Sequence, residues 1–154
     1  MKLFVLCLVI LSMQSIESAC AGSDLPTIYR IKNVVIPDSD KFIPFAMEIK
    51  AGDTVQWTNT DTDDHTIVSD DVFTSVNFRG INKIIHGTVN NGGHPGIFRK
   101  TFNHRGTFIY YCRFHSKLDK DKQPIAPGPE GGIQDEKGNY GTPMMGVITV
   151  MPRY

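Results

Sequence analysis

Residues 106–115 read GTFIYYCRFH, and this stretch decides our prediction of the fold. After the glycine it is a run of β-branched and aromatic residues, a composition that favours a β-strand. Side chains alternate between the two faces of a strand. One face then carries Phe108, Tyr110 and Cys112. We therefore predict a strand over 107–112 that ends in a cysteine, with His115 on the turn that follows.

Segments of the same kind recur along the chain between turn residues, and no segment keeps a 3.6-residue apolar period. The predicted strands are 28–36, 45–49, 54–58, 97–102, 107–112 and 147–150. In the third of these, small polar and apolar residues alternate, as expected of a strand with one buried face. A chain of 154 residues suits one domain with one core. We therefore predict an all-β domain whose strands pack as a sandwich.

Two long segments interrupt this pattern. Residues 70–95 contain four glycines and scattered apolar residues, and we expect an excursion with one short helix or hairpin there. Residues 116–143 are charged and rich in proline and glycine, with too few apolar residues for a core of their own. We predict a long surface loop over these residues. Loops of such length in a compact domain are usually functional or disordered.

The N-terminus has the layout of a secretory signal peptide. Lys2 precedes an apolar run over 3–11, and an Ala-x-Ala site follows. We predict that residues 1–21 are the signal peptide and that residues 22–154 form the single mature domain outside the cytoplasm, secreted or periplasmic. A retained membrane anchor is the weaker reading, because the apolar run is about half of the ~20 residues that a span needs.

Cleavage after Ala21 would leave Cys112 as the only cysteine of the mature chain, so that no internal disulfide could form. A lone thiol in an oxidising compartment is a liability unless it is buried or occupied. A bound metal would occupy it. Lipid attachment to Cys20 is an alternative, although Glu17 stands where such sites normally carry an aliphatic residue.

The charges of the chain balance. Lysine and arginine together number 16, and so do aspartate and glutamate. The predicted signal peptide removes one lysine and one glutamate, which keeps the balance. We therefore expect no nucleic acid and no acidic membrane surface as a partner.

Cys112 and His115 are separated by two residues at a strand end, where a thiolate and an imidazole can face one ion. A second imidazole is best supplied by His65, which follows the strand over 54–58 and an aspartate-rich turn. One soft sulfur and two imidazoles in a trigonal plane form the type 1 copper set. We predict that His65, Cys112 and His115 hold one copper ion.

Other readings of these residues are weaker. A closed zinc site needs more cysteine or histidine at paired spacings than this chain offers. A nucleophilic cysteine–histidine pair fits the strand-end spacing less well than a shared metal does. The remaining histidines stand alone in predicted loops or turns, and we leave them out of the site. They are His86, His94 and His104.

Three segments, taken in order, resemble the cupredoxin family and in particular its plastocyanin-like branch. They are AGDTVQWTN and HTI at 51–59 and 65–67, GTFIYYC and a histidine at 106–112 and 115, and MMGVITV at 144–150. The resemblance spans about residues 28–150, with the two long segments outside it. It implies a Greek-key β-sandwich of two packed sheets. It also implies electron transfer by the copper ion between exported or membrane-bound redox proteins.

In the family's register, Met144 takes the axial position at the copper, and Met145 is its neighbour. The resemblance further implies that Thr66 ties the two ligand loops together and that the electron leaves through His115. The chain departs from the family in one respect. The 28 residues of 116–143 separate the ligand histidine from the axial motif, where plastocyanin-like proteins have only a few.

This long segment leaves alternatives for the axial ligand: Met144, water, a carboxylate or an exogenous molecule. Our main expectation is a non-enzymatic electron carrier. The alternative is a small copper oxidoreductase or ligand-binding protein with an open axial site, acting on nitric oxide or a similar diatomic molecule. Copper storage or delivery is a third and weaker reading, because copper chaperones usually have paired cysteines or methionine clusters.

Overall fold

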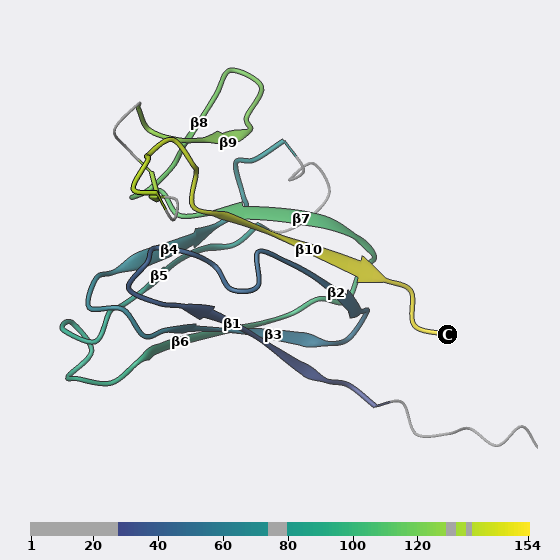
Figure 1. Cartoon of the computed structure of the whole chain (residues 1–154). Helices are drawn as coiled ribbons and strands as arrows, with labels where there is room; N and C mark the ends of the chain where they lie inside the picture. Colours follow the sequence, from purple (N-terminus) through teal and green to yellow (C-terminus); the bar gives the residue numbers. More distant parts are fainter. Residues whose placement is uncertain (1–27, 74–79, 129–131, 135–136) are drawn as a thin grey trace, which may run out of the picture.

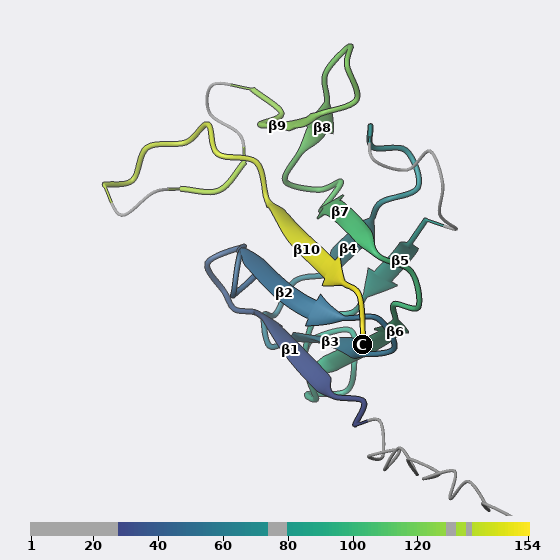
Figure 2. The same ribbon diagram turned by 90° about the vertical axis from the view of Figure 1, so that its right-hand side faces the viewer.

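The computed structural model describes residues 28–73, 80–128, 132–134 and 137–154. The strands in chain order are β1 (Ile31–Ile36), β2 (Ala46–Lys50), β3 (Thr54–Asn59), β4 (His65–Val68), β5 (Asn82–Ile85), β6 (Gly96–Thr101), β7 (Gly106–Tyr111), β8 (Lys117–Leu118), β9 (Pro124–Ile125) and β10 (Met145–Met151). They form one sheet of order β1-β3-β6, a second of order β2-β10-β7-β4-β5, and a small β8-β9 pair. The two larger sheets pack on each other as layers (Figures 1 and 2). The predicted all-β sandwich is confirmed.

Each predicted strand is present, with small differences at its ends. The first strand is shorter than predicted, because the amide of Arg30 donates to the Asp53 carboxylate instead of to a neighbouring strand. β1 and β3 run parallel, as do β2 and β10, and the other pairs are antiparallel. In the excursion over 70–95 the chain returns as β5, which pairs with β4 as a hairpin.

The core follows from the two-residue period of the strands. In β3 and β10 every second residue is buried, because successive side chains point to opposite faces of a sheet. Trp57 of β3 has no exposed surface, and its ring meets that of Tyr110 of β7 edge to face at 5.5 Å. Phe108, Tyr110 and Cys112 contact this core, whereas Ile109 and Tyr111 pack in a second cluster. The predicted division of residues 108–112 between two faces is therefore confirmed.

Three strands meet at one end of the sandwich, which we call the metal end. β4 begins there at His65, β7 ends there just before Cys112, and β10 begins there just after Met144. The register of β10 and β7 pairs Met145 with Tyr111. The predicted ligand residues, which are far apart in the sequence, therefore lie together at the ends of adjacent strands.

The described residues of the segment over 116–143 extend from the metal end and include the β8-β9 hairpin (Figure 1). This segment also contributes an apolar side chain to the core. Ile133 is 9% exposed and packs in the same cluster as Cys112, and its backbone pairs with Thr142. The amide of Phe73 donates to the carbonyl of Lys122, which links this segment to the 70–95 excursion.

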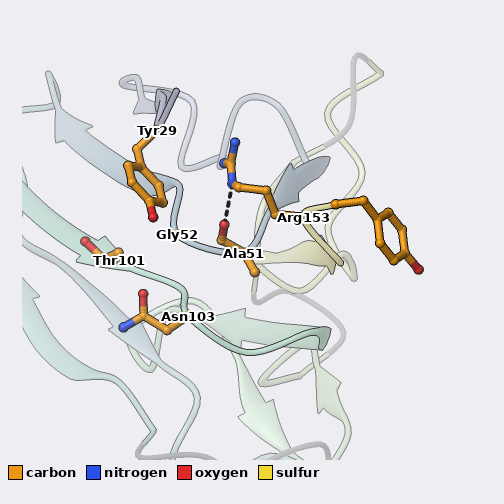
Figure 3. Close-up of a pocket in the computed structure, with 7 residues that line it drawn as sticks. Tyr29, Ala51, Gly52, Thr101, Asn103 and Arg153 are labelled. Atoms are coloured by element: carbon orange, nitrogen blue, oxygen red, sulfur yellow. Dashed lines mark hydrogen bonds between the residues drawn. The ribbon is translucent and has the colours of Figure 1, made fainter. Parts of the chain in front are cut away.

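We call the opposite end of the sandwich the distal end. Asp53 and Arg153 form an ion pair there. Asp53 is buried, accepts the amides of Arg30 and Lys50, and pairs with the Arg153 guanidinium. Arg153 also donates from Nε to the carbonyl of Ala51 at 2.7 Å (Figure 3). One buried carboxylate therefore ties the beginning of the sandwich to its last residues.

The predicted signal peptide, residues 1–21, lies outside the described residues. Within the part of the chain that the structure describes, no helix is long and apolar enough to cross a lipid bilayer.

Candidate metal centre

The metal end brings the three predicted ligands together. The Sγ atom of Cys112 lies 3.7 Å from Nδ1 of His65 and 3.7 Å from Nδ1 of His115. His65 and Cys112 are fully buried, and the side chain of His115 is 25% exposed. A buried thiol therefore faces two imidazoles, of which one reaches the surface.

The spacing of these atoms fits one shared metal ion. With the bond lengths typical of zinc, about 2.3 Å to a thiolate and about 2.0 Å to an imidazole, a trigonal angle of about 120° separates sulfur from nitrogen by about 3.7 Å, and a metal ion with similar bond lengths gives a similar separation. Both histidines present Nδ1 to the sulfur and turn Nε2 away from it. One sulfur with two imidazoles is the donor set of type 1 copper, and the site fits a single copper ion.

The surroundings of Cys112 favour the thiolate that a metal requires. Burial raises the pKa of the thiol, but hydrogen bonds from the His115 and His65 imidazoles and from the amides of Thr66 and Phe114 outweigh burial. Together they lower the pKa of Cys112 to about 5. The same contact with the thiolate raises the pKa of His115. A sulfur that is ionised near neutral pH can bind a metal without a large free-energy cost for losing its proton.

Thr66 connects the two ligand segments. Its amide donates to Sγ of Cys112 at 3.4 Å, and its hydroxyl accepts the amide of Arg113 at 2.7 Å. The link predicted for Thr66 is therefore present. It fixes the segment that contains His65 to the turn that contains His115.

The structure places Met144 beside both ligands of the Cys-x-x-His unit. Its side chain is fully buried in the cluster that also contains Cys112. Its carbonyl accepts the Cys112 amide at 3.0 Å and the Ser116 hydroxyl at 3.1 Å, and its amide donates to the carbonyl of His115. The segment over 116–143 therefore returns the chain to the site. Axial coordination by the Met144 thioether stays a prediction.

Two carboxylates at the outer side of the imidazoles were not predicted. Oδ2 of Asp61 lies 3.1 Å from Nε2 of His65, and Oδ1 of Asp40 lies 3.6 Å from Nε2 of both His65 and His115. Burial raises the pKa of Asp61, but its hydrogen bonds with His65 and with residues 62 and 63 outweigh burial and lower it. The only local signal was the position of Asp61 four residues before a ligand histidine. Asp40 gave none.

Among the described residues, two groups of three side chains have donor atoms close enough to share a metal ion. One is His65, Cys112 and His115, and the other is Asp40, Asp61 and His65. The histidines omitted from the prediction belong to neither group. His86 instead contacts the Asp64 carboxylate at 3.0 Å, near the surface.

The chain is similar to several known proteins. The sequence model of copper binding proteins of the plastocyanin/azurin family matches residues 31–120. The structure is similar to that of a novel purple cupredoxin from Nitrosopumilus maritimus, at 24% identity and a TM-score of 0.48, over 77% of this chain and 98% of that chain. It is also similar to amicyanin from Paracoccus versutus (Thiobacillus versutus), at 18% identity and a TM-score of 0.43, over 83% and 86% of the two chains. The family match contains His65, Cys112 and His115 and ends before Met144.

Proposed function

Because this chain belongs to the plastocyanin/azurin family of copper-binding proteins, we propose that it is an electron-transfer protein whose His65, Cys112 and His115 hold one type 1 copper ion. When bound, copper supplies a one-electron couple between Cu(I) and Cu(II). The observation that carries the proposal is the buried thiol of Cys112, which faces Nδ1 of both imidazoles at 3.7 Å.

The residues around the site favour fast one-electron chemistry because they leave the ligands little freedom. Cys112 is held by the amide of Thr66 and by its own backbone contact with Met144. His65 is fully buried and has Asp61 at its outer nitrogen. Ligands that keep their positions in both oxidation states lower the reorganisation needed for each transfer.

We further propose that electrons enter and leave through His115, toward a redox partner protein. Among the three proposed trigonal ligands, only His115 has an exposed side chain, at 25%, while its neighbour Phe114 is 55% exposed. An imidazole edge beside an exposed aromatic ring suits a brief contact with a partner. Met144 is proposed as the weak axial ligand, because its backbone forms hydrogen bonds with the backbones of both Cys112 and His115.

The test is an absorption and EPR spectrum of the copper-loaded mature protein, repeated with Met144→Ala and with added azide or nitric oxide. We expect the intense thiolate charge-transfer band of a trigonal site, a change with Met144→Ala, and no response to azide or nitric oxide. Met145→Ala is the matched control. Met145 is the next residue, but it packs in the second cluster, with Tyr111, away from Cys112.

Two results would count against this function. A spectrum without the thiolate band would contradict the type 1 site. A spectrum that responds to azide or nitric oxide and is the same in Met144→Ala would show an open axial position and would reject the saturated electron carrier.

We also propose that the protein is exported. The support is the sequence layout of residues 1–21 and the single cysteine, Cys112, that cleavage would leave. Expression of the full chain, followed by N-terminal sequencing of the exported product, should give Gly22 as the first residue. A product that stays in the cytoplasm with an intact N-terminus would contradict export.

A further inference from the structure

We propose that Asp61 and Asp40 are positioning residues that lower the reduction potential of the site by placing carboxylates against the outer nitrogens of the histidine ligands. The inference rests on the proposed type 1 copper function and deepens it. Neither residue would bind the copper directly, because both lie on the side of the imidazoles that faces away from Cys112.

The tautomers of the histidines follow from the geometry. Nδ1 of each ring faces the thiolate and is the atom available to the metal. When Nδ1 of a ring binds the metal in place of a proton, Nε2 carries the hydrogen. In His65 this hydrogen points at Oδ2 of Asp61, at a nitrogen–oxygen distance of 3.1 Å. The result is a carboxylate–histidine–metal arrangement, which fixes the ring and makes its other nitrogen a stronger donor.

Asp61 is itself held in place by the turn that carries it. Its Oδ1 accepts the amides of Thr62 and Asp63 and the Thr62 hydroxyl, which leaves Oδ2 for the imidazole. The carbonyl of Asp61 accepts the amide of Thr88. The side chain is 6% exposed. A carboxylate with so little solvent and so many fixed partners keeps its charge and its direction toward His65.

Asp40 adds a second carboxylate that both rings share. It reaches the site from the connection between β1 and β2, and its Oδ1 is 3.6 Å from Nε2 of each ligand histidine. Its backbone has a φ of 56°, a conformation that few residues other than glycine adopt. The side chain is 33% exposed, so its field is screened more than that of Asp61.

The expected direction follows from charge. Two carboxylates and a thiolate around the metal favour the ion of higher charge, and stronger imidazole donors do the same. Cu(II) is therefore stabilised relative to Cu(I), which lowers the reduction potential. Removing the charge of Asp61 should reverse part of this effect and make the protein easier to reduce.

The experiment measures the reduction potential of the copper-loaded mature protein by titration of its thiolate band. Asp61→Asn keeps the size of the side chain but removes the charge and replaces one of the two acceptor oxygens with an amide group. We expect it to move the ratio of Cu(II) to Cu(I) affinity about tenfold toward Cu(I), which is an increase of about 59 mV for a one-electron couple. Asp63→Asn is the matched control, because it removes the same charge from an exposed position in the same turn.

Asp40→Asn should raise the potential less than Asp61→Asn, and its effect should decrease as salt is added. Asp38→Asn is its control, since Asp38 lies two residues away and is exposed. Equal shifts in Asp61→Asn and Asp63→Asn, or a lower potential in Asp61→Asn, would overturn the inference while the wild-type spectrum still supported the copper function. A wild-type protein without a type 1 spectrum would overturn the copper function, and the inference with it.

A measurement on the wild-type protein covers the case in which Asp61→Asn does not fold. In NMR spectra of the Cu(I) form, the Nε2 hydrogen of His65 should exchange slowly with solvent and resonate downfield, as expected of a buried imidazole that donates to a carboxylate. A resonance at the position of a free imidazole would overturn the inference.

Discussion

The two ends of the sandwich each contain a buried aspartate, and the two side chains have different partners. At the distal end, Asp53 accepts two backbone amides and pairs with the guanidinium of Arg153. At the metal end, Asp61 accepts two backbone amides as well, but its remaining oxygen faces the outer nitrogen of His65. Each carboxylate accepts two backbone amides, so the nitrogen-containing side chain that each one faces, Arg153 or His65, distinguishes them.

The difference shows how the same residue type serves stability in one place and the metal site in another. Arginine keeps its charge at any ordinary pH, so the pair of Asp53 and Arg153 is a permanent link between distant parts of the chain. The imidazole of His65 is a proposed metal ligand, so the carboxylate of Asp61 acts on the metal through it. Substitutions at the two ends should therefore separate stability from copper chemistry.

The largest effect is expected from Cys112→Ser at the metal end. The hydroxyl is a poor ligand for copper, so the thiolate charge-transfer band should disappear completely. At about pH 5, where the Cys112 thiol only begins to ionise, the free energy of unfolding of the metal-free protein should change by about 1 kcal/mol or less, because serine can accept the Thr66 amide that now donates to sulfur. Absorption spectra and urea unfolding measure the two quantities. A retained band would show that the copper is bound elsewhere.

Asp53→Ala at the distal end should give the opposite result. It removes the partner of Arg153 and the acceptor of two amides, and breaking such a buried pair costs about 3 kcal/mol. Urea unfolding of the metal-free protein should show this loss, while the spectrum of the copper-loaded protein stays that of the wild type.

The matched control for Asp53→Ala is Asp63→Ala, which removes an exposed aspartate and should change stability by less than about 0.5 kcal/mol. The contrast between the two ends would be wrong if Asp53→Ala changed the thiolate band, or if it unfolded at the same urea concentration as the control.

The sequence predicted the sandwich and the meeting of His65, Cys112 and His115 because the signals for both are local. The strand over 107–112 is a continuous run of strand-forming residues, and His115 follows it at a fixed distance. In the same way, the strand over 54–58 shows alternating polar and apolar residues, and an aspartate-rich turn leads from it to His65. Pairing of neighbouring strands then brings these segments together, which is why residues 47 positions apart meet at 3.7 Å.

The carboxylates at the site could not be predicted in the same way. Asp61 stands in a turn with several aspartates, and only the folded turn shows which of them faces His65. Asp40 comes from a connection between strands of different sheets, so its position depends on how the sheets pack. Ile133 is a related case. An isolated apolar residue in a polar segment forms no periodic pattern that would predict burial, yet Ile133 packs against the core.

Thr66→Val tests a contact that belongs to the metal end but acts on its backbone. The change keeps the shape of the side chain and leaves the Arg113 amide without its acceptor. We expect a loss of about 1 kcal/mol in the free energy of unfolding and a broader thiolate band, because the two ligand segments are less firmly joined. Thr107→Val, at an exposed position of β7, is the control. An unchanged band would limit the role of Thr66 to stability.

The smallest expected effect is the pH dependence of the stability that the pair of Asp53 and Arg153 contributes. Burial raises the pKa of Asp53, but the amides of Lys50 and Arg30 and the charge of Arg153 outweigh burial and hold it below 3.8. The folded protein therefore binds this proton more weakly than the unfolded chain does. The stability that Asp53 contributes is fully present above the unfolded pKa of 3.8 and is lost as the pH falls through the lower folded value.

The variant for this test is Asp53→Asn, which keeps the size of the side chain and one of its two acceptor oxygens but cannot titrate. The free energy of unfolding should be measured for both metal-free proteins from neutral pH down to about pH 3. The excess stability of the wild type should be constant above about pH 5 and should shrink below 3.8. Acid effects at the metal end are common to both proteins and cancel in the difference. A difference that stays constant, or grows as the pH falls, would mean that the charge of Asp53 does not stabilise the distal end.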